Sequence, residues 1–197
     1  MGDVIKQVDA VFVYIIGFSL ALLLLITAVM IYFLFRYGEK KNPKAADIRG
    51  NFLLELTWMV IPTIIALSMF YFGWESFLGL RGVPKDAIQI QATGMQFAWV
   101  FKYPNGKESE AFLMVPEGKA VKLNLTSLDV IHGFYLPAFR IKMDAIKNMK
   151  TYAWFQAQPA GNYTIYCTQY CGVGHADMTA MLRIVPEKDY LAWLNAK

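Results

Sequence analysis

The chain contains a long segment without a charged side chain, and this segment constrains the fold more than any other. It runs from Ala10 to Phe35 and is almost entirely apolar. About 20 apolar residues in a helix are enough to cross the hydrocarbon core of a bilayer. A second uncharged run, from Leu56 to Trp74, is also long enough. We therefore predict two transmembrane helices, at about residues 10–35 and 55–75.

Two other interpretations of these runs are less favoured. Buried core helices would be apolar too, but 56% of the whole chain is hydrophobic, which is too much for an ordinary soluble domain of this size. A cleaved signal peptide has a shorter apolar region after a basic start. Here the N-terminus mixes Lys6 with Asp3 and Asp9. We expect the first helix to be retained.

The loop between the two apolar runs predicts the orientation of the anchor. It contains more lysine and arginine than aspartate and glutamate. Because basic loops stay in the cytoplasm, both termini are expected on the outer side of the plasma membrane of a prokaryote. Gly79, Gly82 and Pro84 break the helical pattern after the second run. We predict a membrane anchor at residues 1–80 and an extracytoplasmic domain at residues 81–197.

Short β-rich runs separated by turn residues fill the outer domain. They include 87–103, 111–116, 119–127, 151–158, 162–167 and 179–185, with a loop through His132. No helix is long enough for a crossover between parallel strands, which favours an antiparallel sandwich or a Greek-key barrel. Pro186 opens a short terminal helix.

Cysteine and histidine are rare and grouped. The chain has two cysteines, Cys167 and Cys171, and two histidines, His132 and His175. Met178 follows closely, so that the segment YCTQYCGVGHADM carries four soft metal donors. A disulfide between the two cysteines is the simplest alternative outside the cytoplasm. Taken together, however, these residues favour a metal site.

The donor types select the metal. Thiolate and imidazole suit tetrahedral zinc, but zinc does not use a thioether, whereas thiolate, imidazole and methionine together indicate copper. A blue-copper site uses one cysteine. Two cysteines, two histidines and one methionine suffice for two copper ions that share both thiolates. Such a site suits electron transfer, because no coordination position is left open for a substrate.

The segment CTQYCGVGHADM resembles the binuclear copper motif C-x-E-x-C-G-x-x-H-x-x-M of cytochrome c oxidase subunit II. The resemblance extends to DVIHGF, PAFRIKMDAI, TGMQFAWVFKY and an E-x-x-W-x-x-x-P pattern in the second apolar run. It implies a two-helix transmembrane hairpin followed by an all-β cupredoxin-like Greek-key barrel. It also implies two copper ions held by bridging Cys167 and Cys171, by His132 and Met178 on one ion, and by His175 and the Gln169 carbonyl on the other.

The chain departs from the family at two site positions. Gln169 stands where the family usually has a glutamate that also binds magnesium at the subunit interface, so the resemblance leaves that magnesium site in question. Phe97 stands where the family usually has the tryptophan that receives electrons, with Trp99 two residues on. The residues from Arg81 onward also contain more basic than acidic side chains. We expect an apolar or acidic c-type cytochrome as donor rather than a strongly basic one.

The resemblance implies the electron-accepting subunit of a haem-copper terminal oxidase. Electrons would pass from cytochrome c through copper to haem in the partner subunit I, where oxygen is reduced to water and protons are pumped. Glu55 is either a helix-end carboxylate or resembles the glutamate at the mouth of the family's proton channel. Membrane lipid is an expected partner and nucleic acid is not.

Three other functions fit parts of the pattern. The same subunit design serves copper-containing nitric oxide reductases. A membrane-anchored copper chaperone or thiol-disulfide protein would use C-x3-C and a histidine, but usually on a thioredoxin-like fold. Subunits of quinol oxidases lack the copper donors, which are all present here.

Overall fold

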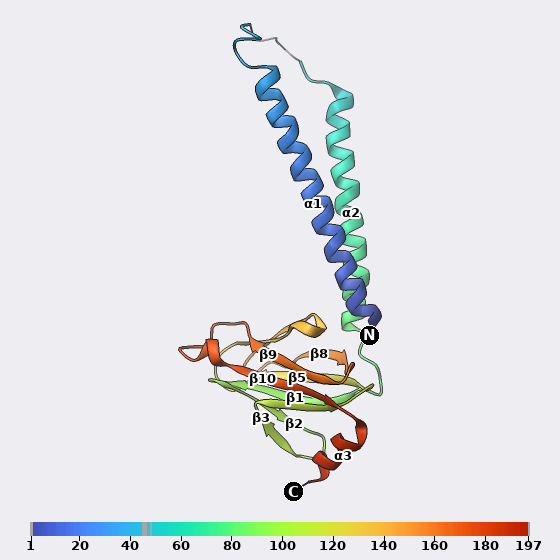
Figure 1. Cartoon of the computed structure of the whole chain (residues 1–197), viewed down its shortest axis with the longest axis vertical. Coiled ribbons are helices and arrows are strands. Elements are labelled where there is room, and N and C mark those ends of the chain that lie inside the picture. The colour runs from blue at the N-terminus through green and yellow to red at the C-terminus, as the bar shows by residue number, and fades with distance from the viewer. Residues whose placement is uncertain (1, 45–46, 48, 197) are drawn as a thin grey trace. The chain divides into compact units, whose positions relative to one another are not determined.

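The computed structural model describes residues 2–44, 47 and 49–196, and they form two compact units (Figure 1). The first unit, Lys6–Phe77, is the helical hairpin. The second takes in the chain from Leu78 onward, together with the first turn of the first helix.

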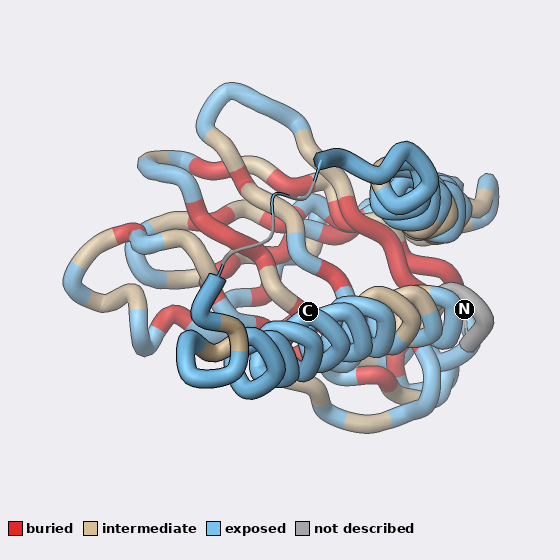
Figure 2. The backbone as a smooth tube through the Cα atoms, turned by 90° about the horizontal axis from the view of Figure 1, so that it is seen from above, coloured by how far each residue is buried: buried red, intermediate tan, exposed pale blue. Residues whose placement is uncertain are grey.

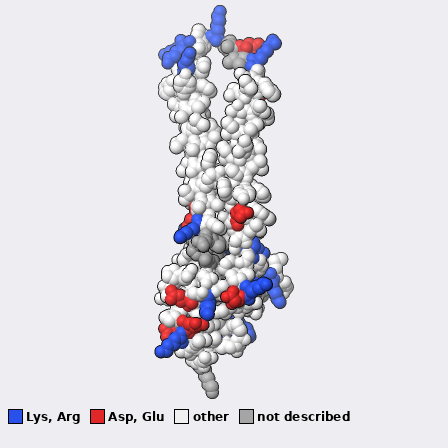
Figure 3. Space-filling view, turned by 90° about the vertical axis from the view of Figure 1, so that its right-hand side faces the viewer, with Lys and Arg blue, Asp and Glu red and all other residues white. Residues whose placement is uncertain are grey.

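The hairpin consists of α1 (Gly2–Arg36) and α2 (Phe52–Arg81). Both are long and apolar enough to span a membrane, and none of their most apolar stretches is buried within the protein. The Asn51 side chain caps α2 by accepting a hydrogen bond from the Leu54 N–H (3.1 Å). Tyr14 and Ser68 form a hydrogen bond between the helices (2.6 Å). Figure 3 shows white, uncharged helix surfaces, with Lys and Arg gathered near the interhelical loop.

The second unit is a sandwich of two five-stranded sheets. One sheet has the order β3-β2-β1-β5-β8, and the other β4-β10-β9-β6-β7. The strands are β1 (Ile88–Met95), β2 (Ala98–Lys102), β3 (Glu108–Glu110), β4 (Phe112–Pro116), β5 (Ala120–Ser127), β6 (His132–Leu136), β7 (Ile141–Ala145), β8 (Thr151–Gln156), β9 (Gly161–Cys167) and β10 (Thr179–Val185). Short 3-10 turns lie at Pro137–Phe139 and His175–Asp177, and α3 (Glu187–Asn195) closes the chain.

The core lies between the two sheets, and in several strands, such as β1, β2, β5 and β10, alternate residues are buried (Figure 2). Along β5, for example, Val121, Leu123 and Leu125 are buried, and the residues between them are partly exposed. This period-2 alternation is what places one face of a strand in the core. The all-β fold after two apolar helices confirms the fold class predicted from the sequence, and α3 confirms the expected terminal helix.

Two features of the sandwich differ from the expectation. The strand pairs β1–β5 and β4–β10 are parallel, whereas an antiparallel arrangement was expected. The connection between the two members of each parallel pair consists of other strands of the sandwich, so no crossover helix is needed. His132 also lies in a strand rather than a loop, because β6 pairs with both β7 and β9.

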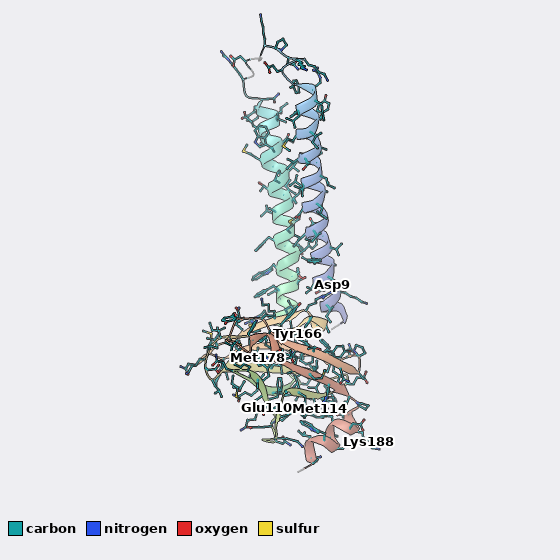
Figure 4. All side chains as sticks on the ribbon, turned by 60° about the vertical axis from the view of Figure 1, so that its left-hand side comes forward. Asp9, Glu110, Met114, Tyr166, Met178 and Lys188 are labelled. Atoms are coloured by element: carbon teal, nitrogen blue, oxygen red, sulfur yellow. The ribbon has the colours of Figure 1, made fainter. Side chains whose placement is uncertain are left out.

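The C-terminal helix packs on the sandwich through aromatic rings. Trp193 makes an edge contact with Tyr103 (ring centroids 4.9 Å apart), and the Lys107 ammonium lies 4.6 Å from the Trp193 ring centroid. The Tyr103 hydroxyl accepts from the N–H of Met114 (2.8 Å) and donates to its carbonyl (3.0 Å). Met114 is labelled in Figure 4.

Candidate metal centre

Two segments far apart in the sequence bring the soft donors together. His132 is the first residue of β6, and Cys167 is the last residue of the neighbouring strand β9. Cys171 and His175 lie in the connection from β9 to β10, and Met178 directly precedes β10 (Figure 4). The Cys167 N–H donates to the Met178 carbonyl (3.1 Å), which closes this connection into a loop.

The donor atoms form a connected chain. The sulfurs of Cys167 and Cys171 are 3.9 Å apart. His132 Nδ1 lies 3.9 Å from Cys167 Sγ, whereas His175 Nδ1 (3.7 Å) and Met178 Sδ (3.7 Å) both lie beside Cys171 Sγ. The sixth predicted donor, the Gln169 carbonyl oxygen, is 3.3 Å from Cys167 Sγ.

These spacings fit metal ligands. Two donors of one tetrahedral ion, with bonds of about 2.0–2.3 Å, lie roughly 3.3–3.8 Å apart. One donor atom each from His132, Cys167 and Cys171 lie within 4.8 Å of one another. Both cysteines are free, and their sulfurs are well beyond the disulfide bond length of about 2.05 Å. The donor set therefore fits soft metal ions, with two thiols at its centre.

The site is enclosed in the sandwich. His132 is fully buried, and Cys167, Cys171 and Met178 are each less than a tenth exposed; His175 is partly exposed. Burial, and next the neighbouring Cys167 thiol, raise the pKa of Cys171 to about 11. A thiol must lose its proton to bind a metal, so metal binding here releases protons.

Asp129 orients the His132 ring. Its Oδ1 atom lies 2.7 Å from His132 Nε2, so that Nδ1, the nitrogen nearer the thiols, is left for a metal. Burial alone would raise the pKa of Asp129. Hydrogen bonds from His132 and from the N–H groups of Gln96 and Val130 outweigh burial, and lower this pKa to about 2. The carboxylate is therefore charged at neutral pH.

Glycines allow neighbouring groups to approach the donors closely. A Cβ atom on Gly94 would lie 2.9 Å from the His132 ring. Gly172 has φ of 134°, and its Cβ would lie 3.0 Å from the Phe97 ring. For Gly174 this distance is 2.6 Å. Real Cβ contacts are longer, so these positions admit no side chain without displacement of the rings.

Phe97 and Trp99 occupy different environments. Phe97 is 37% exposed, and its ring lies against the loop that carries Cys171 and His175. Trp99 is fully buried, with its ring centroid 6.0 Å from that of His132. Trp99 therefore borders the donor set from inside the core and contributes no outer surface.

The side chain of Gln169 points to an acidic partner. Its amide nitrogen donates to both carboxylate oxygens of Asp144, at 3.2 and 3.3 Å. Glu55, in contrast, belongs to the hairpin unit, where it lies in the first turn of α2.

Two polar residues beside the donors, Asp129 and Gln96, were not predicted from the sequence. Asp129 had a usable signal, since D-x-x-H at the end of a strand places a carboxylate within reach of the ring nitrogen that faces away from the metal. Gln96 had none, because its contacts reach residues more than thirty positions away.

The fold and the donors define a class: a β-sandwich protein that follows two helices long and apolar enough to span a membrane, with a buried group of thiol, imidazole and thioether side chains that could hold soft metal ions. Known families narrow this class. "Cytochrome C oxidase subunit II, transmembrane domain" matches residues 3–75, and "Cytochrome C oxidase subunit II, periplasmic domain" matches residues 105–185. The chain belongs to the cytochrome c oxidase subunit II family.

Individual relatives agree with this assignment. The alternative cytochrome c oxidase subunit 2 of Bradyrhizobium diazoefficiens is 31% identical, over 84% of this chain and 71% of the relative. Cytochrome c oxidase subunit 2 of Cereibacter sphaeroides is 26% identical, over 89% and 71%. The crystal structure of the periplasmic domain of subunit II of cytochrome oxidase from Bradyrhizobium japonicum superposes with a TM-score of 0.55, at 35% identity, over 57% of this chain and 94% of that one. The outer domain is thus cupredoxin-like, and the family is a copper-binding component of an oxidoreductase complex.

A further solved structure concerns cysteine chemistry. It is a mixed disulfide intermediate between a thioredoxin-like protein and subunit II of cytochrome c oxidase. That subunit II is 34% identical to this chain and covers 57% of it, with a TM-score of 0.52.

Proposed function

We propose that this chain holds a binuclear copper centre, accepts electrons there from a c-type cytochrome, and passes them to haem in subunit I of a haem-copper oxidase. The observation that carries the proposal is the paired arrangement of the donors. Two thiols lie side by side, each with a histidine nitrogen at 3.7–3.9 Å, and with Met178 and the Gln169 carbonyl beside them. Two copper ions bridged by Cys167 and Cys171 would use all six donors.

A bound centre of this kind would supply one-electron chemistry in which the charge is spread over two metals. The protein contributes a rigid and nearly dry frame. His132 pairs with Ala145 and Cys167 pairs with Phe134, so both donors are fixed by paired strands, and Asp129 holds the His132 ring in place. Because the donors barely need to move, little energy is spent on rearrangement when an electron arrives or leaves.

Exposed apolar side chains near the metal donors support docking of an apolar or acidic c-type cytochrome, the expected electron donor. Phe97 covers the glycines of the Cys171 loop. The segments that carry His132, Cys171 and His175 expose further large apolar side chains: Leu128, Val130, Ile131, Tyr170 and Val173. We infer that electrons enter near Phe97 and that Trp99 acts only as packing for His132. If Phe97→Ala leaves the second-order rate with reduced cytochrome c unchanged, electrons enter elsewhere.

Other parts of the proposal concern the complex. Both termini would lie on the periplasmic side of a bacterial membrane, which places Glu55 on the cytoplasmic side as a candidate for proton uptake. If so, Glu55→Ala should slow turnover without altering the copper content. We propose that magnesium is not held through Gln169, because its amide N–H groups face the Asp144 carboxylate.

Copper analysis of the full-length chain in detergent tests the central proposal. The expected result is two copper ions per chain and a seven-line hyperfine signal from one electron shared by two equivalent nuclei. A single copper ion with a four-line signal would overturn the binuclear assignment. Turnover of the whole complex, with oxygen and nitric oxide supplied separately, then distinguishes an oxidase from a nitric oxide reductase.

The mixed disulfide of the related subunit II supports a second role for the thiols during assembly. We propose that a disulfide between Cys167 and Cys171 can form before copper is bound. A thioredoxin-like dithiol would reduce it: one thiolate attacks the disulfide, the second resolves the mixed disulfide, and the partner is left oxidised. Oxidised chain should bind copper only after such treatment. Equal copper uptake without a reductant would contradict this step.

A further inference from the structure

The turn between β1 and β2 contacts both donor-bearing segments. His132 enters the site as the first residue of β6, whereas Cys171 and His175 come from the connection between β9 and β10. Residues 96 and 97 lie between β1 and β2, which come earlier in the chain and belong to the other sheet. Because this turn belongs to neither segment, its contacts with both limit how far the two segments can move relative to each other.

Gln96 makes a hydrogen bond to each segment. Its backbone N–H donates to Asp129 Oδ2 (2.8 Å), and the other oxygen of that carboxylate lies 2.7 Å from His132 Nε2. Its side-chain amide donates to the carbonyl oxygen of Cys171. Gln96 is thus connected to His132 through the Asp129 carboxylate, and to Cys171 through the backbone carbonyl of Cys171.

Packing by the adjacent residue supports this connection. The Phe97 ring leaves no room for a Cβ atom on Gly172 or Gly174, so it limits movement of the loop on either side of its contact. Cys171 is itself central among the donors, since the sulfur of Cys167, Nδ1 of His175 and Sδ of Met178 all lie within 3.9 Å of its sulfur. A shift of the Cys171 backbone would therefore alter several donor distances together.

We propose that Gln96 is a positioning residue for the metal centre, whose amide fixes the Cys171 segment relative to the His132 segment. The inference rests on the proposed function for the identity of the metal, and on the hydrogen bonds above for the role of Gln96. Such outer contacts typically change metal affinity by about 10- to 100-fold. Gln96 contributes through Cys171 and Asp129 and does not itself bind the metal.

The exposure of Gln96 makes the role testable. Its side chain is not part of the core, so substitution should leave the fold of the metal-free chain intact. Gln96→Met keeps the length of the side chain and removes the N–H donor. Gln96→Glu places a carboxylate oxygen against the Cys171 carbonyl, which is repulsive. The backbone bond from residue 96 to Asp129 remains in both variants.

Gln91→Met is the matched control, because it makes the same change at an exposed position of β1. We would measure copper content, copper loss to a chelator, the visible spectrum and the reduction potential of the full-length chain in detergent, together with thermal unfolding without metal. Relative to the wild type and Gln91→Met, we expect copper affinity to fall about 10-fold in Gln96→Met and further in Gln96→Glu. The spectrum and the potential should shift, and the midpoint of metal-free unfolding should not.

Two results would overturn the inference. Gln96→Met and Gln91→Met could have the same copper affinity, spectrum and potential. Alternatively, the loss of affinity could be matched by an equal loss of stability in the metal-free chain, which would indicate a general structural role. The wild-type metal count separates this outcome from failure of the proposed function. If the wild type holds a single metal ion, the binuclear proposal fails, and the comparison of the two glutamine variants still decides the role of Gln96.

Discussion

The two units of this chain differ in where their apolar side chains lie: the hairpin exposes them, and the sandwich buries them. In the hairpin, large residues such as Leu24 and Phe52 are among the most exposed. In the sandwich, residues of the same kind, such as Leu123 and Phe134, are fully buried. The hairpin relies on lipid as its apolar solvent, whereas the sandwich creates its own apolar interior and can enclose polar donors at defined distances. Specific chemistry is therefore expected to depend on the sandwich.

The sharpest test of this comparison removes one thiol. Cys171→Ser deletes the sulfur that lies beside three other donors. We expect copper affinity to fall by more than about 100-fold, since even changes outside the donor set cost 10- to 100-fold. Helix content and membrane insertion should match the wild type. Retention of two copper ions in this variant would contradict the assignment of Cys171 as a bridging donor.

Removal of a buried hydroxyl from the sandwich is expected to have a smaller effect, on the stability of the outer unit. Tyr103→Phe would leave the N–H and carbonyl groups of Met114 without the partner they share. We expect the free energy of unfolding of the outer unit to fall by about 1–3 kcal/mol, measured by denaturant titration of the full chain in detergent. Tyr166→Phe, on a partly exposed ring, is the control. Equal effects of both variants would mean that the Tyr103 hydroxyl is not structural.

The same hydroxyl predicts a dependence on pH. Burial raises the pKa of Tyr103 from 10.0 to about 12, despite its hydrogen bond to Met114. The folded state therefore favours the neutral phenol. Its full contribution to stability is present below pH 10 and is lost as the pH rises through 12. At pH 11 we expect a loss of about 1.4 kcal/mol. Tyr103→Phe should show a flatter profile between pH 10 and 12, and an unchanged slope would refute this cause.

The smallest effect is expected in the hairpin. Tyr14→Phe removes the hydrogen bond to Ser68, and such bonds within membranes contribute about 0.6 kcal/mol on average. Helix association in mixed micelles should weaken by about this amount, while copper content stays the same. Tyr32→Phe removes a hydroxyl from an exposed position of the same helix and serves as the control. A loss of copper in Tyr14→Phe would show that the two units are coupled.

Much of the fold could be predicted from sequence because its signals are local. Uncharged apolar runs predicted α1 and α2, and alternation predicted strands such as β5 and β10. The strands β3, β6 and β7 were missed. They have three to five residues each, and β3 (ESE) and β7 (IKMDA) carry charges that hide the alternation. Their pairing partners, rather than their composition, make them strands.

The candidate site also has a part that could be predicted from the sequence and a part that could not. The donors could be named because four of them fall within one short segment whose residue types have few other uses together. The residues that orient them could not all be found, because their contacts are distant in sequence. Gln96 meets Asp129 and Cys171 only once both sheets are assembled. The local sequence pattern thus indicates which side chains are candidate metal donors, whereas the tertiary structure determines which residues hold those donors in place.

The parallel pairing of β4 with β10 has a consequence for biogenesis. Met181 pairs with Phe112, and Val185 with Pro116, so β4 lacks this neighbouring strand until β10 has been synthesised. Since β10 also pairs with β9, the loop that carries Cys171 and His175 closes only then. We therefore expect the thiols to stay open to oxidation until β10 is in place, and any metal to be inserted only after synthesis is complete. On this expectation, the topology of the chain sets the earliest point at which its site can receive a metal.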